Sequence, residues 1–350
     1  MLGQITYNVW CFAKAGLKRT NVELTTKDDI MTESLIEKQN GNFAKPVLGV
    51  VLSLFDGMSC GQIALNRAGI SYGKYYASEI DKHAIKVTQH NYPDTIQLGS
   101  VTEIKGTDLP QIDLLIGGSP CQGFSFSGKQ LNFDDPRSKL FFEFVRLIKE
   151  CKPKYWLLEN VVMKKEFEQV ITEHLGVEPV KINSALVSAQ NRERLYWANF
   201  PIEQPNDKGI KLIDILEDTE MIGPSAIRGR RLNKATILGR RLNDKGKRED
   251  YNKEIPITQC LEVRATNRDK SNCLTTVAKD NVLTTMPIGR HPDAFKNNLP
   301  FRYYTIKEYC RLQTVPENYF DGVATENQIR KMIGNGWTVD VIAHIFGGLS

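Results

Sequence analysis

Apolar and polar residues follow one another along the chain in blocks that predict alternating strands and helices. A β-branched and leucine-rich run over residues 47–54 predicts a buried strand, which closes on Phe55-Asp56-Gly57. Helical periodicity follows it, through Ile63 and Leu65 to Ala68. Further strands are predicted over 75–80, 112–118 and 155–158, and further helices over 83–90, 140–149, 305–312 and 327–346. This order favours a mostly parallel sheet with helices on both faces.

The pattern changes after Pro201, where the chain becomes polar and loses clear periodicity. Residues 227–233 and 237–243 form a near-repeat, Ile-Arg-Gly-Arg-Arg-Leu-Asn followed by Ile-Leu-Gly-Arg-Arg-Leu-Asn. Two copies are too few for a solenoid, so short strands or loops in a small separate module are expected. The predicted organisation is an arm of unreadable role over 1–45, one domain built from 46–200 and 301–350, and an inserted module over 201–300.

Composition indicates a soluble protein that is not exported. With 41% hydrophobic and 25% charged residues the chain is ordinarily globular, and the apolar stretch at Val9–Ala13 is much too short to span a bilayer. The seven cysteines form no C-x-x-C pair and no zinc-ligand spacing, which argues against a metal site and a disulfide framework. We therefore expect a cytoplasmic protein without a metal and without a membrane partner.

Positive charge is concentrated in the inserted module. The net charge of the whole chain is +5, whereas residues 225–250 carry nine Lys or Arg against three Asp or Glu. Such a cluster is most often a solvated face, and it also suits contacts with nucleic acid. The arginines of interest in this stretch are Arg228, Arg230, Arg231, Arg240 and Arg241.

The ends of the first two predicted strands suggest a site for an adenosine-containing ligand. In an open α/β sheet, ligands lie beyond the carboxyl ends of the strands, where glycines let the backbone approach them. Phe55-Asp56-Gly57 lies at one such end, and Glu79 closes the next strand, 24 residues beyond Phe55. A carboxylate at that spacing suits ribose hydroxyls. A plain turn and a surface acid would give the same pattern.

A cysteine and an acid at later strand ends suggest covalent chemistry. Cys121 lies in the small-residue loop 117–128, which suits a mobile segment carrying a nucleophile. A lone cysteine is more often an inert buried side chain. Glu159 ends the apolar strand that begins at Tyr155, where burial would favour its protonated form. A protonated acid beside a thiolate is what attack on a pyrimidine ring requires.

Taken together, these segments resemble the cytosine-5 DNA methyltransferase family over roughly residues 46–200 and 301–350. The sequences of residues 53–57 and 140–144 are similar to those of the de novo animal branch and its phage-encoded relatives. The motifs that carry the resemblance, in the family's order, are Phe55-Asp56-Gly57, Glu79, Pro120-Cys121-Gln122, Glu159-Asn160-Val161, Gln190-Asn191-Arg192-Glu193-Arg194 and Gly334-Asn335-Gly336-Trp337. The resemblance implies a class I S-adenosylmethionine-dependent methyltransferase (Rossmann-like) fold, with a mixed sheet and a small inserted target-recognition domain.

The resemblance also implies roles for the catalytic residues. Cys121 would add to ring carbon 6 of a cytosine while Glu159 holds ring nitrogen 3, so that carbon 5 can accept the methyl group. Arg192 and Arg194 would hold the exocyclic oxygen of the base and the active-site loop or phosphates. Because the target atoms lie inside duplex DNA, the base must first be flipped out.

For the methyl donor, S-adenosylmethionine, the resemblance implies a site at the first strand ends. Phe55 would stack on adenine, Glu79 would bind ribose, and the backbone of residues 57–61 would face the methionine end. The family's C-terminal helix would return to this site. The residues expected to contact the donor are Phe55, Asp56, Gly57, Met58, Ser59, Gly61, Glu79, Ile80, Ser100, Val101, Ser119, Pro120, Asn335 and Trp337.

The expected partner is double-stranded DNA, bound by a monomer in a bacterial or phage-infected cell. Gln122, Ser125 and Ser127 would contact DNA from the loop that follows Cys121. The arginine cluster of residues 201–300 would contact guanine edges or phosphates.

Three alternative functions share parts of this pattern. A transfer-RNA cytosine methyltransferase shares the catalytic set, but the arginine-bearing insert of about 100 residues favours DNA. The presence of both Cys121 and Glu159 argues against a catalytically weak DNA-binding relative. A nicotinamide-dependent dehydrogenase fails because the glycine fingerprint is wrong.

One position departs from the family pattern and generates a prediction. Where the family has Gly-Asp, with the Asp accepting from the adenine amino group, this chain has Gly99-Ser100. The shorter, uncharged side chain predicts donor binding weaker by about 1 kcal/mol, the value of one altered hydrogen bond. We expect Ser100→Asp to tighten donor binding in calorimetry by that amount. Unchanged affinity would contradict the assignment of Ser100.

Overall fold

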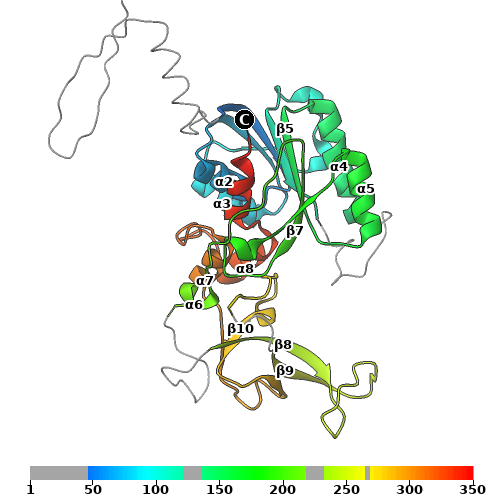
Figure 1. Ribbon diagram of the computed structural model, residues 1–350, viewed down its shortest axis with the longest axis vertical. Helices are drawn as coiled ribbons and strands as arrows, with labels where there is room; N and C mark the ends of the chain where they lie inside the picture. Colours follow the sequence, from blue (N-terminus) through cyan, green and yellow to red (C-terminus); the bar gives the residue numbers. More distant parts are fainter. Residues whose placement is uncertain (1–45, 121–135, 218–231, 265–268, 350) are drawn as a thin grey trace, which may run out of the picture. The chain divides into compact units, whose positions relative to one another are not determined.

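A seven-stranded sheet forms the centre of the computed structural model, which describes residues 46–120, 136–217, 232–264 and 269–349 (Figure 1). The strand order is β3-β2-β1-β4-β5-β7-β6. In chain order the strands are β1 Leu48–Leu54, β2 Tyr72–Ser78, β3 Ile96–Gln97, β4 Leu114–Gly118, β5 Tyr155–Val161, β6 Val180–Asn183 and β7 Glu193–Ala198.

The sheet is mixed, which confirms the predicted α/β class. Strands β1 to β5 pair in parallel, whereas β7 is antiparallel to both β5 and β6. The sequence analysis did not anticipate β6. Strand β7, which begins one residue after Arg192, was not predicted either. Because β1 and β4 are neighbours although β2 and β3 lie between them in sequence, the chain reverses direction here, which is where open sheets bind ligands.

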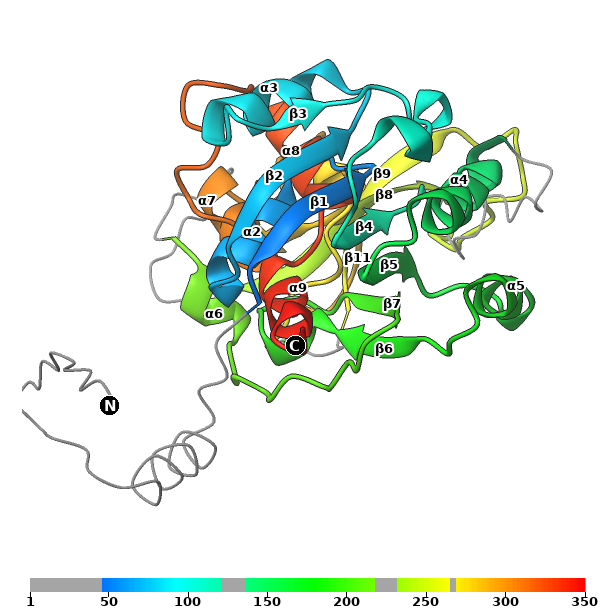
Figure 2. The same cartoon turned by 90° about the horizontal axis from the view of Figure 1, so that it is seen from above.

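Helices cover both faces of this sheet (Figure 2). The residues of β1 alternate between two apolar clusters, so the strand is buried on both sides, as expected for a parallel sheet. One cluster holds α2 Cys60–Ala68, α3 Lys82–Asn91 and α9 Val339–Phe346, and the other holds α4 Pro136–Cys151 and α5 Lys165–Leu175. Helix α5 was not predicted.

Local signals explain where several helices begin and end. Helix α2 ends at Gly69, whose φ of 69° is left-handed and suits glycine. Helix α3 begins after Asp81, whose side chain accepts from the N–H of His83. Helix α7, Ile306–Gln313, has a reciprocal capping box between Thr305 and Glu308.

The helix predicted over 327–346 is two helices, so that prediction was wrong. Helix α8 spans Glu326–Asn335, and α9 begins at Val339. The physical reason is that the carbonyl of Gly336 accepts hydrogen bonds from the side chains of Arg192 and Gln313, at 2.8 and 2.9 Å. These side-chain donors hold an extended turn at Gly336 in place of continued helix.

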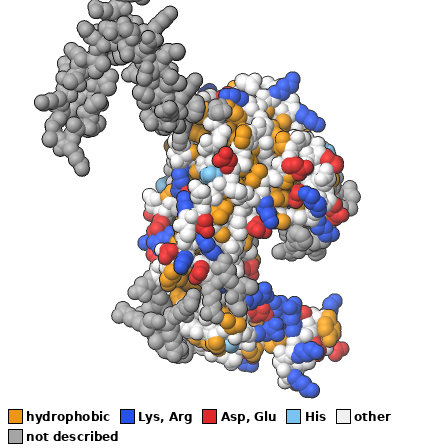
Figure 3. All heavy atoms as spheres, in the orientation of Figure 1, with side chains coloured by type: hydrophobic (Ala, Val, Ile, Leu, Met, Phe, Trp, Pro, Cys, Tyr) orange, Lys and Arg blue, Asp and Glu red, His pale blue; other side chains and the backbone are white. Residues whose placement is uncertain are grey.

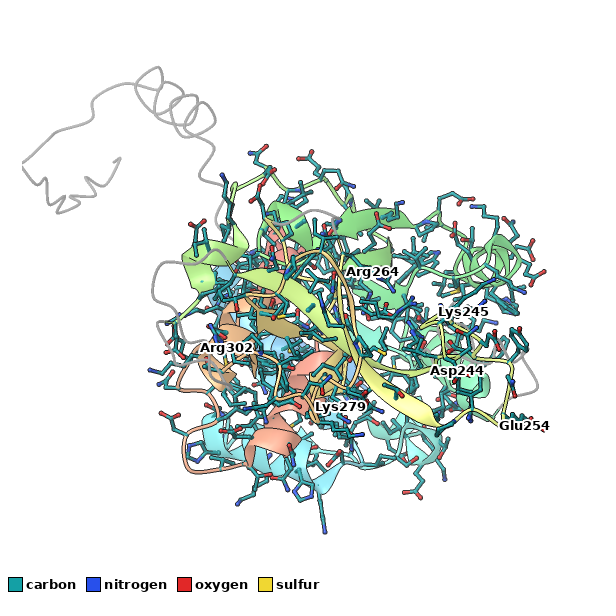
Figure 4. The ribbon with its side chains drawn as sticks, turned by 90° about the horizontal axis from the view of Figure 1, so that it is seen from below. Asp244, Lys245, Glu254, Arg264, Lys279 and Arg302 are labelled. Atoms are coloured by element: carbon teal, nitrogen blue, oxygen red, sulfur yellow. The ribbon has the colours of Figure 1, made fainter. Side chains whose placement is uncertain are left out.

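The chain between β7 and α7 contributes a second, five-stranded antiparallel sheet. Its order is β11-β9-β8-β10-β12, formed by β8 Asn233–Arg241, β9 Ile257–Val263, β10 Val282–Thr284, β11 Gly289–His291 and β12 Phe301–Tyr303. This sheet extends to Tyr303, three residues beyond the expected boundary at 300. Most of the second copy of the near-repeat lies in β8, whereas the first copy falls almost wholly outside the described residues. In Figure 4, Asp244, Lys245 and Glu254 lie at the far end of the β8–β9 pair from Arg302.

A buried ion pair joins this second sheet to helix α7. Arg302 of β12 donates to both carboxylate oxygens of Glu308, at 2.7 Å each, and the two side chains are 4% and 0% exposed. The same carboxylate accepts from the backbone N–H groups of Glu217 and Thr305. Four donors around one buried carboxylate compensate for its removal from water.

Among the described residues, no helix is both long enough and apolar enough to cross a membrane.

This ion pair yields a prediction about folding. Glu308→Gln removes the negative charge and leaves Arg302 buried without its counter-charge, which costs about 3–5 kcal/mol. We expect the free energy of unfolding, measured by urea denaturation, to fall by that amount. The matched change Glu317→Gln, in the exposed pair with Arg311, is expected to cost less than about 1 kcal/mol. Equal effects of the two changes would contradict the role of burial.

Candidate active site

A cavity of about 340 Å³ opens at the carboxyl ends of β1, β4 and β5. Its walls come from segments far apart in sequence: the turn after β1, the end of β2, the ends of β4 and β5, the start of β7, and the α8–α9 turn. Predicted site residues that line it are Phe55, Asp56, Gly57, Met58, Glu79, Ser119, Pro120, Glu159, Arg192, Arg194, Asn335 and Trp337. The structure therefore brings together most of the donor residues and the described part of the catalytic set.

The turn after β1 has an unusual backbone. Phe55 and Ser59 have left-handed φ values of 57° and 64°, and Gly57 has 59°. For a bulky residue such as Phe55 this conformation costs of order 1–3 kcal/mol, and such strain gathers at functional sites. Ser59 and Gly61, also predicted to bind the methyl donor, are buried and do not line the cavity.

Glu79 lines the cavity just after β2. Its Oε2 accepts from the N–H of Gly57 at 2.7 Å, and its Oε1 accepts from those of Ile80 and Asp81 at 2.7 and 2.8 Å. These bonds fix the carboxylate and tie it to the turn after β1. The side chain of Ile80 does not line the cavity and is 78% exposed.

Glu159 is held from two sides. Arg194 Nε lies 2.9 Å from its Oε1, and the Trp337 indole N–H donates to its Oε2 at 3.1 Å. The ion pair with Arg194 was not anticipated by the argument from burial. Gly118 makes this approach possible, because a Cβ there would lie 2.8 Å from Trp337 Nε1 and 2.9 Å from Glu159 Oε2.

The strand ends of β4 and β5 are tied together next to this acid. The Asn160 side-chain amide donates to the Ser119 hydroxyl at 3.0 Å, and both side chains are buried. Ser119 and Pro120 line the cavity and immediately precede Cys121. Cys121 itself and the predicted DNA contacts Gln122, Ser125 and Ser127 lie outside the described residues.

Arg192 occupies a different position from Arg194. It is 3% exposed, and its guanidinium donates to the carbonyls of Leu274, Gly334 and Gly336, at 3.1, 3.2 and 2.8 Å. Burial lowers its pKa from the usual arginine value. Arg192, just before β7, thus joins that strand to the backbone at Leu274 and to the α8–α9 turn. Its contacts hold these three segments in position.

Asp56 is a buried acid in the cavity wall. It is 8% exposed, and its Oδ1 accepts from the Tyr75 hydroxyl at 2.8 Å. Its Oδ2 makes no hydrogen bond to any described residue. Burial raises the pKa of Asp56 to about 6, against the lowering influence of nearby hydroxyls from Ser53, Tyr75 and Ser59.

Two residues that were predicted to bind the methyl donor lie away from the cavity wall. Ser100 caps the short 3₁₀ helix Val101–Glu103, accepting from the N–H of Thr102, and Val101 is buried. Neither side chain lines the cavity.

The two predicted arginines of strand β8, Arg240 and Arg241, make contacts within the inserted part of the chain. Arg240 pairs with Glu262 at 2.8 Å and with Asp250 at 3.6 Å, and Arg241 donates to the carbonyls of Lys253 and Ile255. In Figure 3, Lys and Arg side chains gather where Figure 1 places β8 and β9. Arg228, Arg230 and Arg231 lie outside the described residues.

A carboxylate that was not predicted from the sequence lies among three arginines of this region. Glu262 is 8% exposed and accepts from Arg240, Arg290 and Arg264, at 2.8, 3.1 and 3.2 Å. The hydrogen bond from Arg240 is the largest of the influences that lower the pKa of Glu262 to about 2. Two further cavity residues were not predicted: Asn160, which lies in the Glu159-Asn160-Val161 motif, and Lys331, which lies one turn before Asn335.

Comparison with known proteins gives the cavity its chemical context. Residues 50–350 match the family described as C-5 cytosine-specific DNA methylase. The type II methyltransferase M1.ScrFI of Lactococcus lactis subsp. cremoris is 32% identical over 294 residues, which cover 76% of this chain and 69% of that protein. The orphan methyltransferase M.SPRI of Bacillus phage SPR is 38% identical over 42% of this chain. That match spans only 36% of the phage protein's length.

Solved structures share the fold. The methyltransferase EhMeth of Entamoeba histolytica superimposes with a TM-score of 0.63 at 17% identity, covering 87% of this chain and 98% of that chain. A mutant DNMT2 of Spodoptera frugiperda gives a TM-score of 0.58 at 18% identity, covering 86% and 99%. At this identity the likeness concerns the fold alone.

The geometry of Arg192 generates a prediction. Arg192→Met removes a buried donor from three carbonyls and is expected to lower the free energy of unfolding by about 3 kcal/mol. Thermal and urea unfolding measure this. The control Arg248→Met changes a side chain that is 50% exposed, and we expect less than about 1 kcal/mol there. A stable Arg192→Met protein would show that the guanidinium is not a structural brace.

Proposed function

Because this chain belongs to the C-5 cytosine-specific DNA methylase family, we propose that it is a DNA (cytosine-5-)-methyltransferase acting on one short duplex sequence. The observation that carries the proposal is the held carboxylate of Glu159. It lies in the same cavity as the Phe55 turn and as Pro120, the residue before Cys121. An acid, a neighbouring cysteine and a donor cavity are the parts that methylation of a cytosine ring requires.

Glu159 and Arg194 supply the polar contacts for the base. Cytosine carbon 6 is a poor electrophile, so the nucleophile needs help from groups that stabilise charge on the ring. Glu159 would hold ring nitrogen 3 as the Cys121 sulfur forms its bond to carbon 6, and Arg194 would lie close to the exocyclic oxygen. Electron density then accumulates at carbon 5 of the ring. Trp337 keeps the carboxylate in place throughout.

The covalent cycle is balanced by elimination. After carbon 5 gains a methyl group, its proton leaves to a base, and the electrons of that C–H bond restore the double bond as the Cys121 sulfur departs from carbon 6. The cysteine is regenerated as a thiolate. Cys121 is thus required in every turnover and consumed in none.

The cavity residues fit S-adenosylmethionine as the donor. This group supplies an electrophilic methyl when bound. Phe55 offers an aromatic face, the fixed carboxylate of Glu79 suits ribose hydroxyls, and Asn335 and Trp337 close the wall from the C-terminal segment. A volume of about 340 Å³ falls within the range of ligand pockets.

Duplex DNA is the proposed substrate, with the target cytosine flipped into the cavity at a cost of a few kcal/mol. The chain between β7 and α7 is proposed as the target-recognition domain, in a monomeric cytoplasmic enzyme. The arginines around Glu262 are held with their charge partly balanced, which suits ordered contacts better than loose electrostatic attraction. The type II names of the relatives suggest a modification enzyme of a restriction system.

Expression in cells tests this function directly. We expect bisulfite sequencing of a plasmid from cells that express the protein to show methylated cytosines in one sequence context. Cys121→Ser should abolish the signal to background, because no thiolate adds to carbon 6. Glu159→Gln should lower the rate of methylation by at least about 100-fold. Methyl label that enters transfer RNA while duplex DNA stays unmodified would contradict the proposal and favour the RNA activity.

A further inference from the structure

The second sheet has one apolar face and one polar face. On the apolar face, Ala235, Leu261, Val282 and Phe301 belong to a separate apolar cluster. Directly opposite residues of an antiparallel pair share a face, and so do residues two apart along one strand. The register therefore gathers charged and polar side chains on the other face. They are Lys234, Thr236 and Arg240 of β8, Glu262 of β9, Arg290 of β11 and Arg302 of β12.

This polar face is covered at one side and open at the other. At the β12 side, Arg302 holds Glu308 of α7, and Leu283, directly opposite Arg302, belongs to the apolar cluster that also holds α2, α3 and α9. Toward β9 and β11 the face is open to solvent, because the side chains of Arg290 and Arg264 are 35% and 68% exposed. The open part is therefore continuous with the junction to the central sheet's domain.

Glu262 lies at the centre of the open part, and its carboxylate accepts from three guanidinium groups. Its Oε1 accepts from the Nε atoms of Arg240 and Arg290, at 2.8 and 3.1 Å. Its Oε2 accepts from Nη2 of Arg264 at 3.2 Å and from Nη2 of Arg240 at 3.4 Å. The remaining nitrogen of Arg240 lies 3.6 Å from Asp250. Arg240 is thus fully engaged, whereas the other two arginines each give one nitrogen to Glu262.

Arg290 keeps a pair of donors for a ligand. Its Nε is bonded to Glu262, and its two terminal nitrogens make no hydrogen bond with any described residue. Because a guanidinium is planar, a carboxylate that holds Nε leaves the parallel N–H groups of the terminal nitrogens open. Arg290 also lies directly opposite Glu262 in the register, on β11 at the edge of the sheet. Its donor fork is therefore both fixed and accessible.

The charge balance of this cluster favours an uncharged acceptor over a phosphate. Arg240, Arg264 and Arg290 bring three positive charges, of which Glu262 offsets one and Asp250 part of another. A carboxylate at the centre of the cluster would repel a phosphate, whereas an uncharged group gains from donors that are held in one geometry. Guanine presents O6 and N7 in the major groove as two acceptors that match the fork of an arginine.

We propose that Arg290 reads a guanine edge in the target duplex through its terminal nitrogens, and that Glu262 is the positioning residue for this specificity. The inference rests on the proposed function, because it takes duplex DNA as the substrate. It names the side chain that selects a base and the side chain that holds it, whereas the proposed function gives only the part of the chain that contacts DNA.

Bisulfite sequencing of plasmid DNA tests the proposal through the sequence context of methylation. We expect the wild type to require, besides the partner of the target cytosine, a guanine of either strand at one position. Arg290→Lys keeps the positive charge but removes the fork, so methylation should persist while preference at that position falls by about tenfold. Glu262→Gln removes the charge and one acceptor oxygen that hold Arg290, and it should relax the same position.

Glu254→Gln is the matched control. It makes the same chemical change at an exposed acid, at the far end of the β8–β9 pair from Arg302 (Figure 4). We expect this variant to keep the wild-type context at every position.

Binding of synthetic duplexes provides a second measurement, which does not depend on turnover. The full chain is titrated with a fluorescent duplex of the wild-type context, and with duplexes in which each required guanine in turn is 7-deazaguanine, which lacks the N7 acceptor. At one position this change should weaken wild-type binding by about tenfold and leave binding by Arg290→Lys and Glu262→Gln nearly unchanged. A role in folding alone would weaken the binding of all duplexes equally.

The outcomes separate the two levels of inference. A context that stays strict in both variants, or that requires no further guanine, overturns the reading role of Arg290 and leaves the proposed function standing. Equal weakening of all duplexes in Arg290→Lys shows a phosphate contact and also overturns it. Absence of methylation by the wild type overturns the proposed function itself. Relaxation at one guanine in both variants, with the context of Glu254→Gln unchanged, supports the proposal.

Discussion

The buried guanidinium of Arg192 is the contact on which the shape of the cavity depends. It joins the start of β7 to the carbonyls of Leu274, Gly334 and Gly336. A charged group at 3% exposure is unfavourable unless every donor finds an acceptor, so the three carbonyls must be in place together. With these carbonyls held in place, α8 ends and the chain turns, so that the indole of Trp337 reaches Glu159. Removal of one donor group would therefore loosen walls that come from three parts of the sequence.

Strain and desolvation gather in the turn after β1, which also lines the cavity. The left-handed backbone at Phe55 and Ser59 and the buried acid Asp56 are each unfavourable by themselves. They persist because β1 is buried on both faces and Tyr75 is fixed between its neighbours. The stable sheet compensates for a ligand-facing turn that would not hold this conformation alone. Stability and function thus make opposite demands within a few residues.

The sequence predicted the regular parts of this molecule because they follow from local patterns. The strand at 47–54, the turn at Gly57 and the helix ending at Gly69 each depend on neighbouring residues. The ordered motifs also located the cavity. A local pattern does not determine which residues from distant parts of the sequence come into contact. The break between α8 and α9 depends on Arg192, some 140 positions earlier, so helical periodicity across 327–346 predicted one helix where there are two.

The same limit applies to charges. Arg192 and Arg194 are two positions apart and gave one prediction, yet one is a buried brace and the other pairs with Glu159. In the second sheet, the density of arginines was evident, but Glu262 was not, because one acid among many carries no signal until the strands bring it beside three guanidinium groups. Ser100, identified by alignment with a motif, lies in a 3₁₀ cap away from the cavity wall.

The hydrogen bond between Trp337 and Glu159 joins residues 178 positions apart, and this has a consequence for synthesis on the ribosome. A nascent chain that has emerged as far as β7 already contains all seven strands of the central sheet, together with Glu159 and Arg194. It lacks the wall that α8 and its following turn contribute. Domains form as they emerge, so the sheet can assemble well before its cavity closes. Ligand-binding competence would therefore arise only once α8 and its following turn have emerged, and the growing polypeptide would carry an open, unfinished pocket until then.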